Sequence, residues 1–179
     1  MTPVDLDLLG ALGIDAAVLA ARPLSPHLEA NELVVAEVGE GDRQFMLTPA
    51  TSAAWSHMKS QAQHDGINLL MVSAFRSVQR QTEIIQQKLD AGLSIADILS
   101  VCAPPGFSEH HTGRAIDITC REAPDLEISF EDTAAFAWLQ QHAPTYSFRL
   151  SYPRDNAAGF EYEPWHWCYQ DAATVCGDR

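Results

Sequence analysis

The order of the predicted helices and strands constrains the fold most, because it lacks the regular strand–helix–strand alternation that a parallel sheet requires. Apolar runs predict strands at residues 31–38, 43–48, 67–75, 114–120 and 146–153, and an extended segment at 160–170 that Pro164 interrupts. Capping residues and glycine stops predict helices at residues 4–21, 49–64, 77–92, 94–102 and 130–143. This irregular mixture indicates an α+β fold, with a mostly antiparallel central sheet flanked by helices.

The length of 179 residues is enough for one domain with a buried core, which we expect to span residues 31–179. Residues 1–30 are expected to form a helical extension packed on that domain. The extension does not match an export signal, because three aspartates interrupt its apolar residues and the first basic residue, Arg22, follows them. The sequence therefore predicts a cytoplasmic protein, or a periplasmic one if a leader has been removed.

The formal net charge of -13 and the pI near 4.7 argue against a nucleic-acid partner, whose phosphates need Lys and Arg for neutralisation. The same charge argues against anionic membranes, and no apolar run is long enough to span a bilayer. The cysteines form no C-x-x-C pair, so they do not match a cysteine zinc knuckle. We expect free, mostly buried thiols, with two disulfides as the alternative, at Cys102, Cys120, Cys168 and Cys176.

The segment SEHHTGRAIDI, residues 108–118, joins a loop to a predicted strand. Side chains alternate along a strand, so Asp117 shares a face with the small Ala115 and points away from the large aliphatic residues. A carboxylate on such a face suits a cleft, and either His110 or His111 in the preceding loop could lie beside it. The residues alone leave that choice open, and they equally allow an ordinary strand-edge hydrogen bond for Asp117.

The segment EYEPWHWCY, residues 161–169, places Glu163 three residues before His166. Pro164 restricts the backbone between them, which helps both side chains to converge on one site. Two histidines and one carboxylate can hold zinc and leave a fourth position for water, and a further carboxylate can accept that water's proton. The alternative is a surface glutamate beside a hydrogen-bonded core histidine.

The segment SAFRSVQRQ, residues 73–81, places Arg76 where a strand turns into a helix. A guanidinium in a cleft binds a carboxylate through two hydrogen bonds, and Gln81 could add a neutral donor. The alternative is an arginine at a helix start with a solvated head group.

Taken in order, the three segments resemble the VanY-type D-alanyl-D-alanine and L,D-carboxypeptidases. These are zinc metallopeptidases of bacterial peptidoglycan, related to the VanX dipeptidases and in fold to the Hedgehog signalling domain. The resemblance runs from about Leu33 to Tyr169. Its S-x-H-x-x-G-x-A-x-D pattern selects His110 over His111, because it falls on Ser108, His110, Gly113, Ala115 and Asp117.

The other family patterns match with some departures. E-P-W-H falls on residues 163–166 without change. S-G-Y-R-S-x-x-x-Q falls on residues 73–81, with Ala and Phe in place of its Gly and Tyr. R-Y-P appears as S-Y-P, which keeps Tyr152 but puts Ser151 in place of the arginine.

The resemblance implies a Hedgehog-like or D-Ala-D-Ala-peptidase-like fold with zinc in a surface cleft. It implies that the metal ligands are His110, Asp117 and His166, and that Glu163 is the base. Substrate binding is implied for Arg76, Gln81, Ser108 and Tyr152, with Arg76 on the terminal carboxylate. The implied partners are peptidoglycan stem peptides or muropeptides.

The function implied by the resemblance is release of C-terminal D-alanine from these peptides. The predicted cytoplasmic location favours an L,D-carboxypeptidase that acts on the tetrapeptide in cell-wall recycling, because cytoplasmic pentapeptides are precursors that wall synthesis needs. The alternatives are a D,D-carboxypeptidase, a peptidoglycan endopeptidase, and a non-catalytic binding protein on the same fold.

Overall fold

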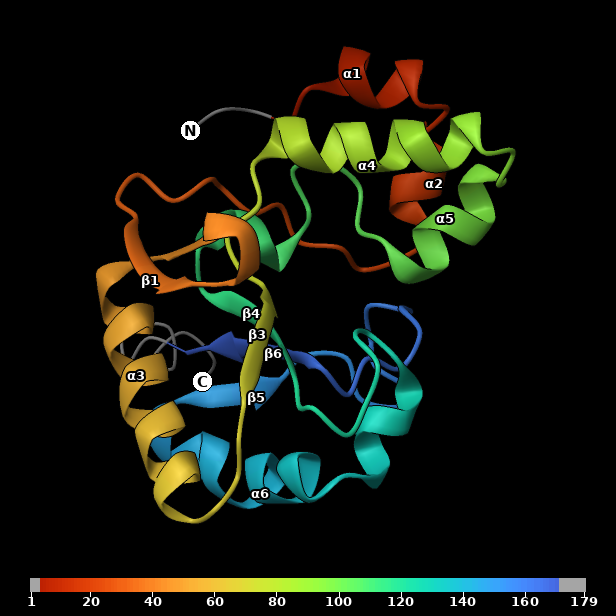
Figure 1. The fold of residues 1–179 in the computed structure, drawn as a ribbon. Coiled ribbons are helices and arrows are strands. Elements are labelled where there is room, and N and C mark those ends of the chain that lie inside the picture. The colour runs from red at the N-terminus through yellow and green to blue at the C-terminus, as the bar shows by residue number, and fades with distance from the viewer. Residues whose placement is uncertain (1–3, 171–179) are drawn as a thin grey trace, which may run out of the picture.

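The computed structural model describes residues 4–170, which form a sheet-containing part and a helical part (Figure 1). The helical part consists of α1 (Leu6–Ala11), α2 (Ala16–Ala20), α4 (Val78–Asp90) and α5 (Ile95–Val101). The sheet-containing part also has two helices at its periphery, α3 (Pro49–His64) and α6 (Ala134–His142). None of the helices in residues 4–170 is long and apolar enough to cross a membrane.

The main sheet has four strands in the order β3-β4-β6-β5, and all neighbours are antiparallel. These strands are β3 (Leu70–Ser73), β4 (Ala115–Thr119), β6 (His166–Tyr169) and β5 (Phe148–Leu150). A separate antiparallel pair is formed by β1 (Val34–Val38) and β2 (Gln44–Leu47). The expected α+β class with an antiparallel sheet is therefore confirmed.

Several element boundaries differ from the expectation, for local reasons. The predicted helix at 4–21 is two helices, because Gly13 has a φ of 77° and the Asp15 side chain caps a new helix by accepting from Val18 N. The predicted helix at 130–143 is α6 preceded by a 3₁₀ turn, Ile128–Asp132, because Thr133 Oγ1 accepts from Phe136 N and starts a helix there. The strands predicted at 67–75 and 146–153 are shorter, and 160–165 is not a strand.

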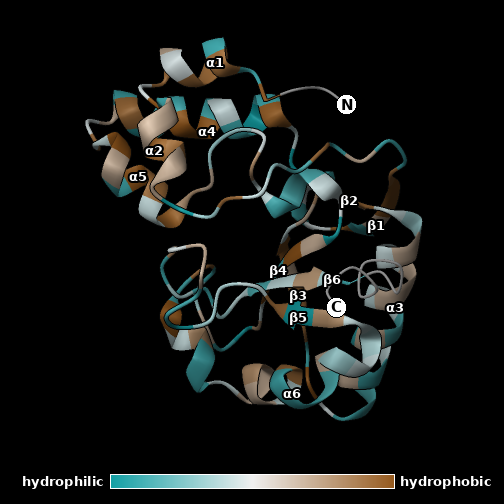
Figure 2. Ribbon diagram, turned by 180° about the vertical axis from the view of Figure 1, so that it is seen from behind, coloured by the Kyte–Doolittle hydropathy of each residue, from teal (hydrophilic) through white to brown (hydrophobic). Residues whose placement is uncertain are grey.

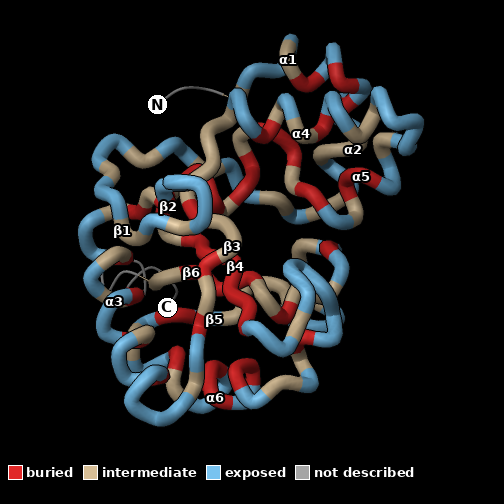
Figure 3. Tube along the Cα trace, viewed as in Figure 1, coloured by how far each residue is buried: buried red, intermediate tan, exposed pale blue. Residues whose placement is uncertain are grey.

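Two separate clusters of buried apolar side chains stabilise the fold. One lies between the main sheet and the helices α3 and α6, and includes Trp55, Ile116 and Trp167. The other joins α1 and α2 to α4 and α5, and includes Leu9 and Ile85. Figure 2 shows apolar stretches in the helices of this second group, and Figure 3 shows burial along β4 and β6. The segment that contains α1 and α2 thus forms a core of its own with α4 and α5.

The register between β4 and β6 decides which side chains share a face. Asp117 lies directly opposite His166, and Ile116 lies opposite Trp167. Opposite residues of an antiparallel pair point to the same face. One face of the two strands therefore carries Asp117 and His166, while the other enters the core, as the alternation in the sequence predicted for Asp117.

Gly113 connects β4 to the 3₁₀ turn Glu109–Thr112. Its φ is 63°, in the left-handed region, and a Cβ built there would lie 2.8 Å from Leu33 Cδ2. Both facts favour glycine at this position. The sharp reversal places His110, in the turn, beside the strand that follows.

The cysteines that the structure describes, Cys102, Cys120 and Cys168, are free and buried, as expected. Cys176 lies outside the described residues.

Candidate functional site

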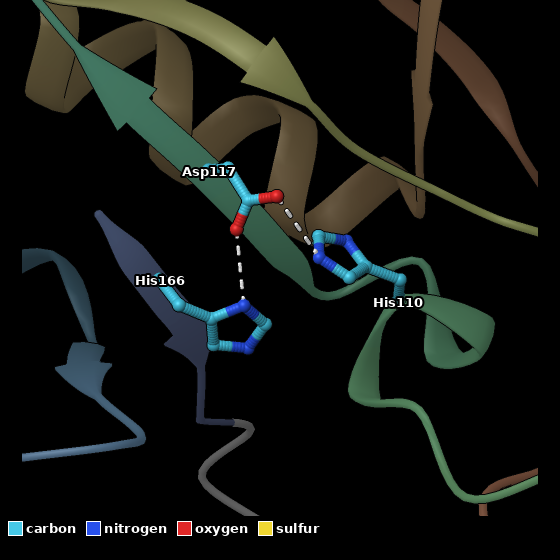
Figure 4. Close-up of side chains that lie close together, drawn as sticks. All are labelled: His110, Asp117 and His166. Atoms are coloured by element: carbon cyan, nitrogen blue, oxygen red, sulfur yellow. Dashed lines mark hydrogen bonds and ion pairs between the residues drawn. The ribbon is translucent and has the colours of Figure 1, made fainter. Parts of the chain in front are cut away.

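Three buried side chains from different elements meet at the predicted metal site (Figure 4). His110 comes from the 3₁₀ turn, Asp117 from β4 and His166 from β6. Asp117 Oδ2 lies 3.2 Å from His110 Nε2, and Asp117 Oδ1 lies 3.0 Å from His166 Nδ1. One ligand atom from each residue fits within 4.8 Å of the others. The structure therefore brings together the three residues predicted as metal ligands.

The second histidine of the pair, His111, makes other contacts. Its Nδ1 lies 2.6 Å from the carbonyl oxygen of Arg76, and its Nε2 accepts from Gly106 N at 3.1 Å. Both nitrogens are thus occupied by backbone groups of two loops. His111 holds these loops together, and His110 is the histidine that faces Asp117.

The outer nitrogens of both clustered histidines are also bonded. His110 Nδ1 lies 2.7 Å from the carbonyl oxygen of Ala74, to which it donates, so Nε2 is left facing the cluster. His166 Nε2 lies 2.9 Å from Glu109 Oε2, so its Nδ1 faces the cluster. Such outer contacts fix the tautomer and orientation of metal-binding histidines.

The electrostatics of the cluster favour a cation. Burial would raise the pKa of Asp117, but the charge and hydrogen bonds of His110 and His166 outweigh it and hold this pKa well below its usual range. Burial would lower the pKa of His166, but the hydrogen bonds that its ring donates to Asp117 and Glu109, together with the negative charges of these carboxylates, raise it to about 10. An anionic carboxylate is thus buried between two imidazoles, and its negative charge attracts a cation to the cluster.

This donor set fits Zn²⁺. Zinc in proteins binds imidazole nitrogen and carboxylate oxygen, and catalytic sites use three protein ligands with a fourth position open. His110, Asp117 and His166 supply three such donors, and they line a cleft of about 500 Å³. The open cleft gives a fourth ligand a way in.

Glu163 lies beside this cluster but outside it. A turn closed by a hydrogen bond from His166 N to Glu163 O at 3.1 Å contains Pro164 at its first central position. The turn brings Glu163 Oε2 to 3.8 Å from His166 Nδ1. Burial raises the pKa of Glu163 to about 7, and the negative charge of Asp117 adds to this. A carboxylate with such a pKa can both accept and return a proton near neutral pH.

Arg76 brings a positive charge to the same end of the cleft. Its Nη2 lies 4.0 Å from Asp117 Oδ2, and its backbone N donates to His110 O at 3.2 Å. The guanidinium also donates to Gln81 Oε1 at 3.0 Å and to Ser73 Oγ at 3.1 Å. Arg76 is therefore fixed by both its main chain and its side chain at the predicted metal site.

Gln81 is used differently from the simple donor that the sequence suggested. Its side chain is buried, and Nε2 donates to Ala103 O at 2.7 Å and to Cys102 Sγ at 3.0 Å. Its carbonyl oxygen accepts from Arg76. Because both ends of the amide are bonded within the protein, Gln81 orients the Arg76 guanidinium and does not itself offer a donor to the substrate.

Ser108 and Tyr152 also line the cleft. Ser108 Oγ accepts from His110 N at 3.3 Å and so caps the turn that carries this ligand. The Tyr152 ring centroid lies 4.8 Å from that of His166, and burial raises the pKa of its phenol. Tyr152 thus stays protonated and can donate a hydrogen bond into the cleft.

Two residues at the site were not recognised from the sequence. Glu109 bonds His166 as described above, and Ser151 Oγ donates to Glu109 Oε2 at 2.6 Å. Burial would raise the pKa of Glu109, but the hydrogen bond and charge of His166 lower it to about 2. Glu109 and His166 are 57 residues apart, so no local spacing could have linked them.

Comparison with known proteins identifies the family. The family model described as "VanY: D-alanyl-D-alanine carboxypeptidase" matches residues 44–172. The putative carboxypeptidase YodJ of Bacillus subtilis (strain 168) is 32% identical over 165 residues, which are 87% of this chain and 60% of that protein. The chain thus spans about 60% of the length of this relative.

Solved structures agree with this assignment. The structure of the LD-carboxypeptidase LdcB has a TM-score of 0.72 and 31% identity, and the match covers 83% of this chain and 73% of that one. The fold is also that of the D,D-pentapeptidase VanY crystallised with Zn(II), at a TM-score of 0.61, 24% identity and 86% coverage of each chain. The expected fold is therefore confirmed, and the chain belongs to the VanY family of D-alanyl-D-alanine carboxypeptidases.

Proposed function

We propose that this protein is a zinc carboxypeptidase that releases C-terminal D-alanine from peptidoglycan peptides, and that it acts as an L,D-carboxypeptidase on the tetrapeptide. The observation that carries the proposal is the combination at one end of the cleft of a three-donor zinc site, a carboxylate and a guanidinium. The carboxylate is Glu163 and the guanidinium is Arg76. A binding protein would need the metal site but not a base beside it.

Bound zinc would supply a Lewis acid that polarises the scissile carbonyl and lowers the pKa of water. Glu163 accepts the proton of the attacking water and returns it to the leaving amine of D-alanine. Arg76, oriented by Gln81, binds the terminal carboxylate of the substrate with two hydrogen bonds. Tyr152 and Ser108 border the same space and offer further hydrogen bonds.

The shape of the cleft favours cleavage at a chain end. His110 and Asp117, at its inner end, are 4% and 3% exposed, whereas Val101, Leu126 and Ile128 on its walls are 41%, 43% and 46% exposed. The substrate therefore enters with one end in the buried part, where Arg76 offers a positive charge. The carboxylate of a peptide C-terminus can pair with this charge, whereas an internal peptide bond is followed by a neutral amide, which favours a carboxypeptidase over an endopeptidase.

The preference for the tetrapeptide rests on similarity. LdcB, an LD-carboxypeptidase, is 31% identical with a TM-score of 0.72. The D,D-dipeptidase VanXYg is 26% identical with a TM-score of 0.66. Because both substrates end in D-alanine, Arg76 itself does not distinguish them.

Incubation of the zinc-loaded protein with stem tetrapeptide and pentapeptide, with products read by mass spectrometry, tests the proposal. We expect tetrapeptide to lose one D-alanine and to give tripeptide faster than pentapeptide reacts. Rapid cleavage of pentapeptide with no action on tetrapeptide would establish a D,D-carboxypeptidase instead. Cleavage only within cross-linked peptides would establish an endopeptidase.

Arg76→Ala should show whether the enzyme recognises the C-terminal carboxylate of its substrate. With a tetrapeptide that has a free C-terminus, we expect kcat/KM to fall by at least about 10-fold, because a charge-assisted hydrogen bond contributes about 1.5–3 kcal/mol. The same tetrapeptide with an amidated C-terminus should be a poor substrate for the parent protein. Its kcat/KM should fall little further in Arg76→Ala. Equal losses for both peptides would show that Arg76 only maintains the structure of the site.

A further inference from the structure

His166 is a buried imidazole with a carboxylate on each side. Its Nδ1 lies 3.0 Å from Asp117 Oδ1, and its Nε2 lies 2.9 Å from Glu109 Oε2. Only Nδ1 faces the other candidate ligands, so Glu109 has no part in the chemistry described so far. We propose that Glu109 is a positioning residue for the metal: it fixes the tautomer and orientation of His166, and Ser151 fixes Glu109 in turn.

The three residues form a closed loop of hydrogen bonds across three segments. Ser151 Oγ donates to Glu109 Oε2 at 2.6 Å, the same oxygen that contacts His166 Nε2. Ser151 N donates to the carbonyl oxygen of His166 at 3.3 Å. Ser151 therefore holds both the backbone of the histidine and the carboxylate that orients its ring. With His166 buried and Glu109 Oε2 held by Ser151, the ring has one way to face the cluster.

The two histidines of the cluster differ in the charge of their outer partners. His110 Nδ1 donates to a neutral carbonyl, that of Ala74, at 2.7 Å, whereas the partner of His166 is the carboxylate of Glu109. With a metal on Nδ1 of His166, Nε2 would keep its proton and donate a hydrogen bond to Glu109. A carboxylate acceptor makes the imidazole more electron-rich than a carbonyl does, and so strengthens its bond to the metal. Glu109 would thus contribute to metal affinity without contacting the metal.

A simpler role for Glu109 is to tie the 3₁₀ turn to the end of β5, through Ser151. That role predicts a loss of stability when Glu109 is replaced, with no change in the bond between metal and protein. The positioning role predicts a change in the metal site itself. The inference concerns the same site as the proposed function, but its test measures metal binding and stands apart from D-alanine release.

The test measures zinc affinity by competition with a chelator, and the visible absorption spectrum of the cobalt-substituted protein, which reports ligand geometry. We expect Glu109→Ala to weaken zinc binding by about 10- to 100-fold and to shift the cobalt spectrum. Glu109→Gln keeps an oxygen that can accept from Nε2 but loses the charge, so its loss should be smaller. Ser151→Ala should weaken zinc binding by about 5-fold, as expected for one hydrogen bond.

The matched control is Glu32→Ala, at an exposed glutamate before β1, which should leave zinc affinity and the cobalt spectrum unchanged. Parent-like zinc affinity and an unchanged cobalt spectrum in folded Glu109→Ala would overturn the proposal. If Glu109→Ala does not fold, Glu109→Gln decides the question by the same two measurements, and parent-like values there overturn it equally.

Discussion

Replacing Glu163 with glutamine is expected to lower kcat on stem tetrapeptide by about 10²- to 10⁴-fold, the range typical of a positioned acid–base group. Glutamine has the same size and keeps the packing, but its amide cannot accept the proton of the attacking water. The carboxylate is suited to the task, because burial raises the pKa of Glu163 to about 7. Steady-state kinetics with D-alanine detection gives the change in kcat.

Glu163 is not one of the three clustered ligands, so elemental analysis of Glu163→Gln should still find zinc. Circular dichroism should show the parent fold. The matched control is Glu122→Gln, the same chemical change at an exposed glutamate in the loop after β4. Parent-like turnover in a zinc-loaded Glu163→Gln would exclude Glu163 as the base.

Replacing His110 with alanine should remove zinc, and the neighbouring His111 offers a matched comparison. His110 Nε2 faces Asp117, so its loss leaves only two donors. We expect zinc affinity to fall by more than the roughly 100-fold that loss of an outer-shell partner can cause. His111→Ala should keep zinc and instead lower the free energy of unfolding by about 1–3 kcal/mol, because Arg76 O and Gly106 N lose their partner.

Elemental analysis and chemical denaturation measure these two effects. Loss of zinc in His111→Ala, together with parent-like zinc content in His110→Ala, would show that the two histidines exchange roles in solution.

The sequence predicted most of the fold because local signals were strong. The helix caps at Thr48 and Ser77 and the glycine stops set the long helices, and the structure places α3 and α4 within a residue or two of the predicted ranges. Boundaries were wrong where a single side chain starts a new element, as Asp15 and Thr133 do. Such caps compete with a continuous helix, and hydropathy alone does not show which of the two is favoured.

The sequence by itself determined the residue types of the site and their local spacing. Alternation along one strand was enough to place Asp117 on the face away from the core, and the turn at Pro164 brings Glu163 back to His166. From the residues alone, however, His110 and His111 were equivalent. Only the family resemblance selected one of them before the structure was known.

Tertiary structure decided the rest, because it depends on pairing between distant segments. The β4–β6 register puts Asp117 opposite His166, 49 residues away, and a shift of one residue would turn one of these side chains into the core. The separate β5–β6 pairing places Ser151 beside His166, where its Oγ reaches Glu109. Gln81 orients Arg76 and does not donate into the cleft, because its Nε2 donates to Ala103 O in the loop after α5 and its Oε1 accepts from Arg76. These contacts join residues that share no local pattern, so hydrogen-bonding and packing in the folded chain, rather than spacing, determine them.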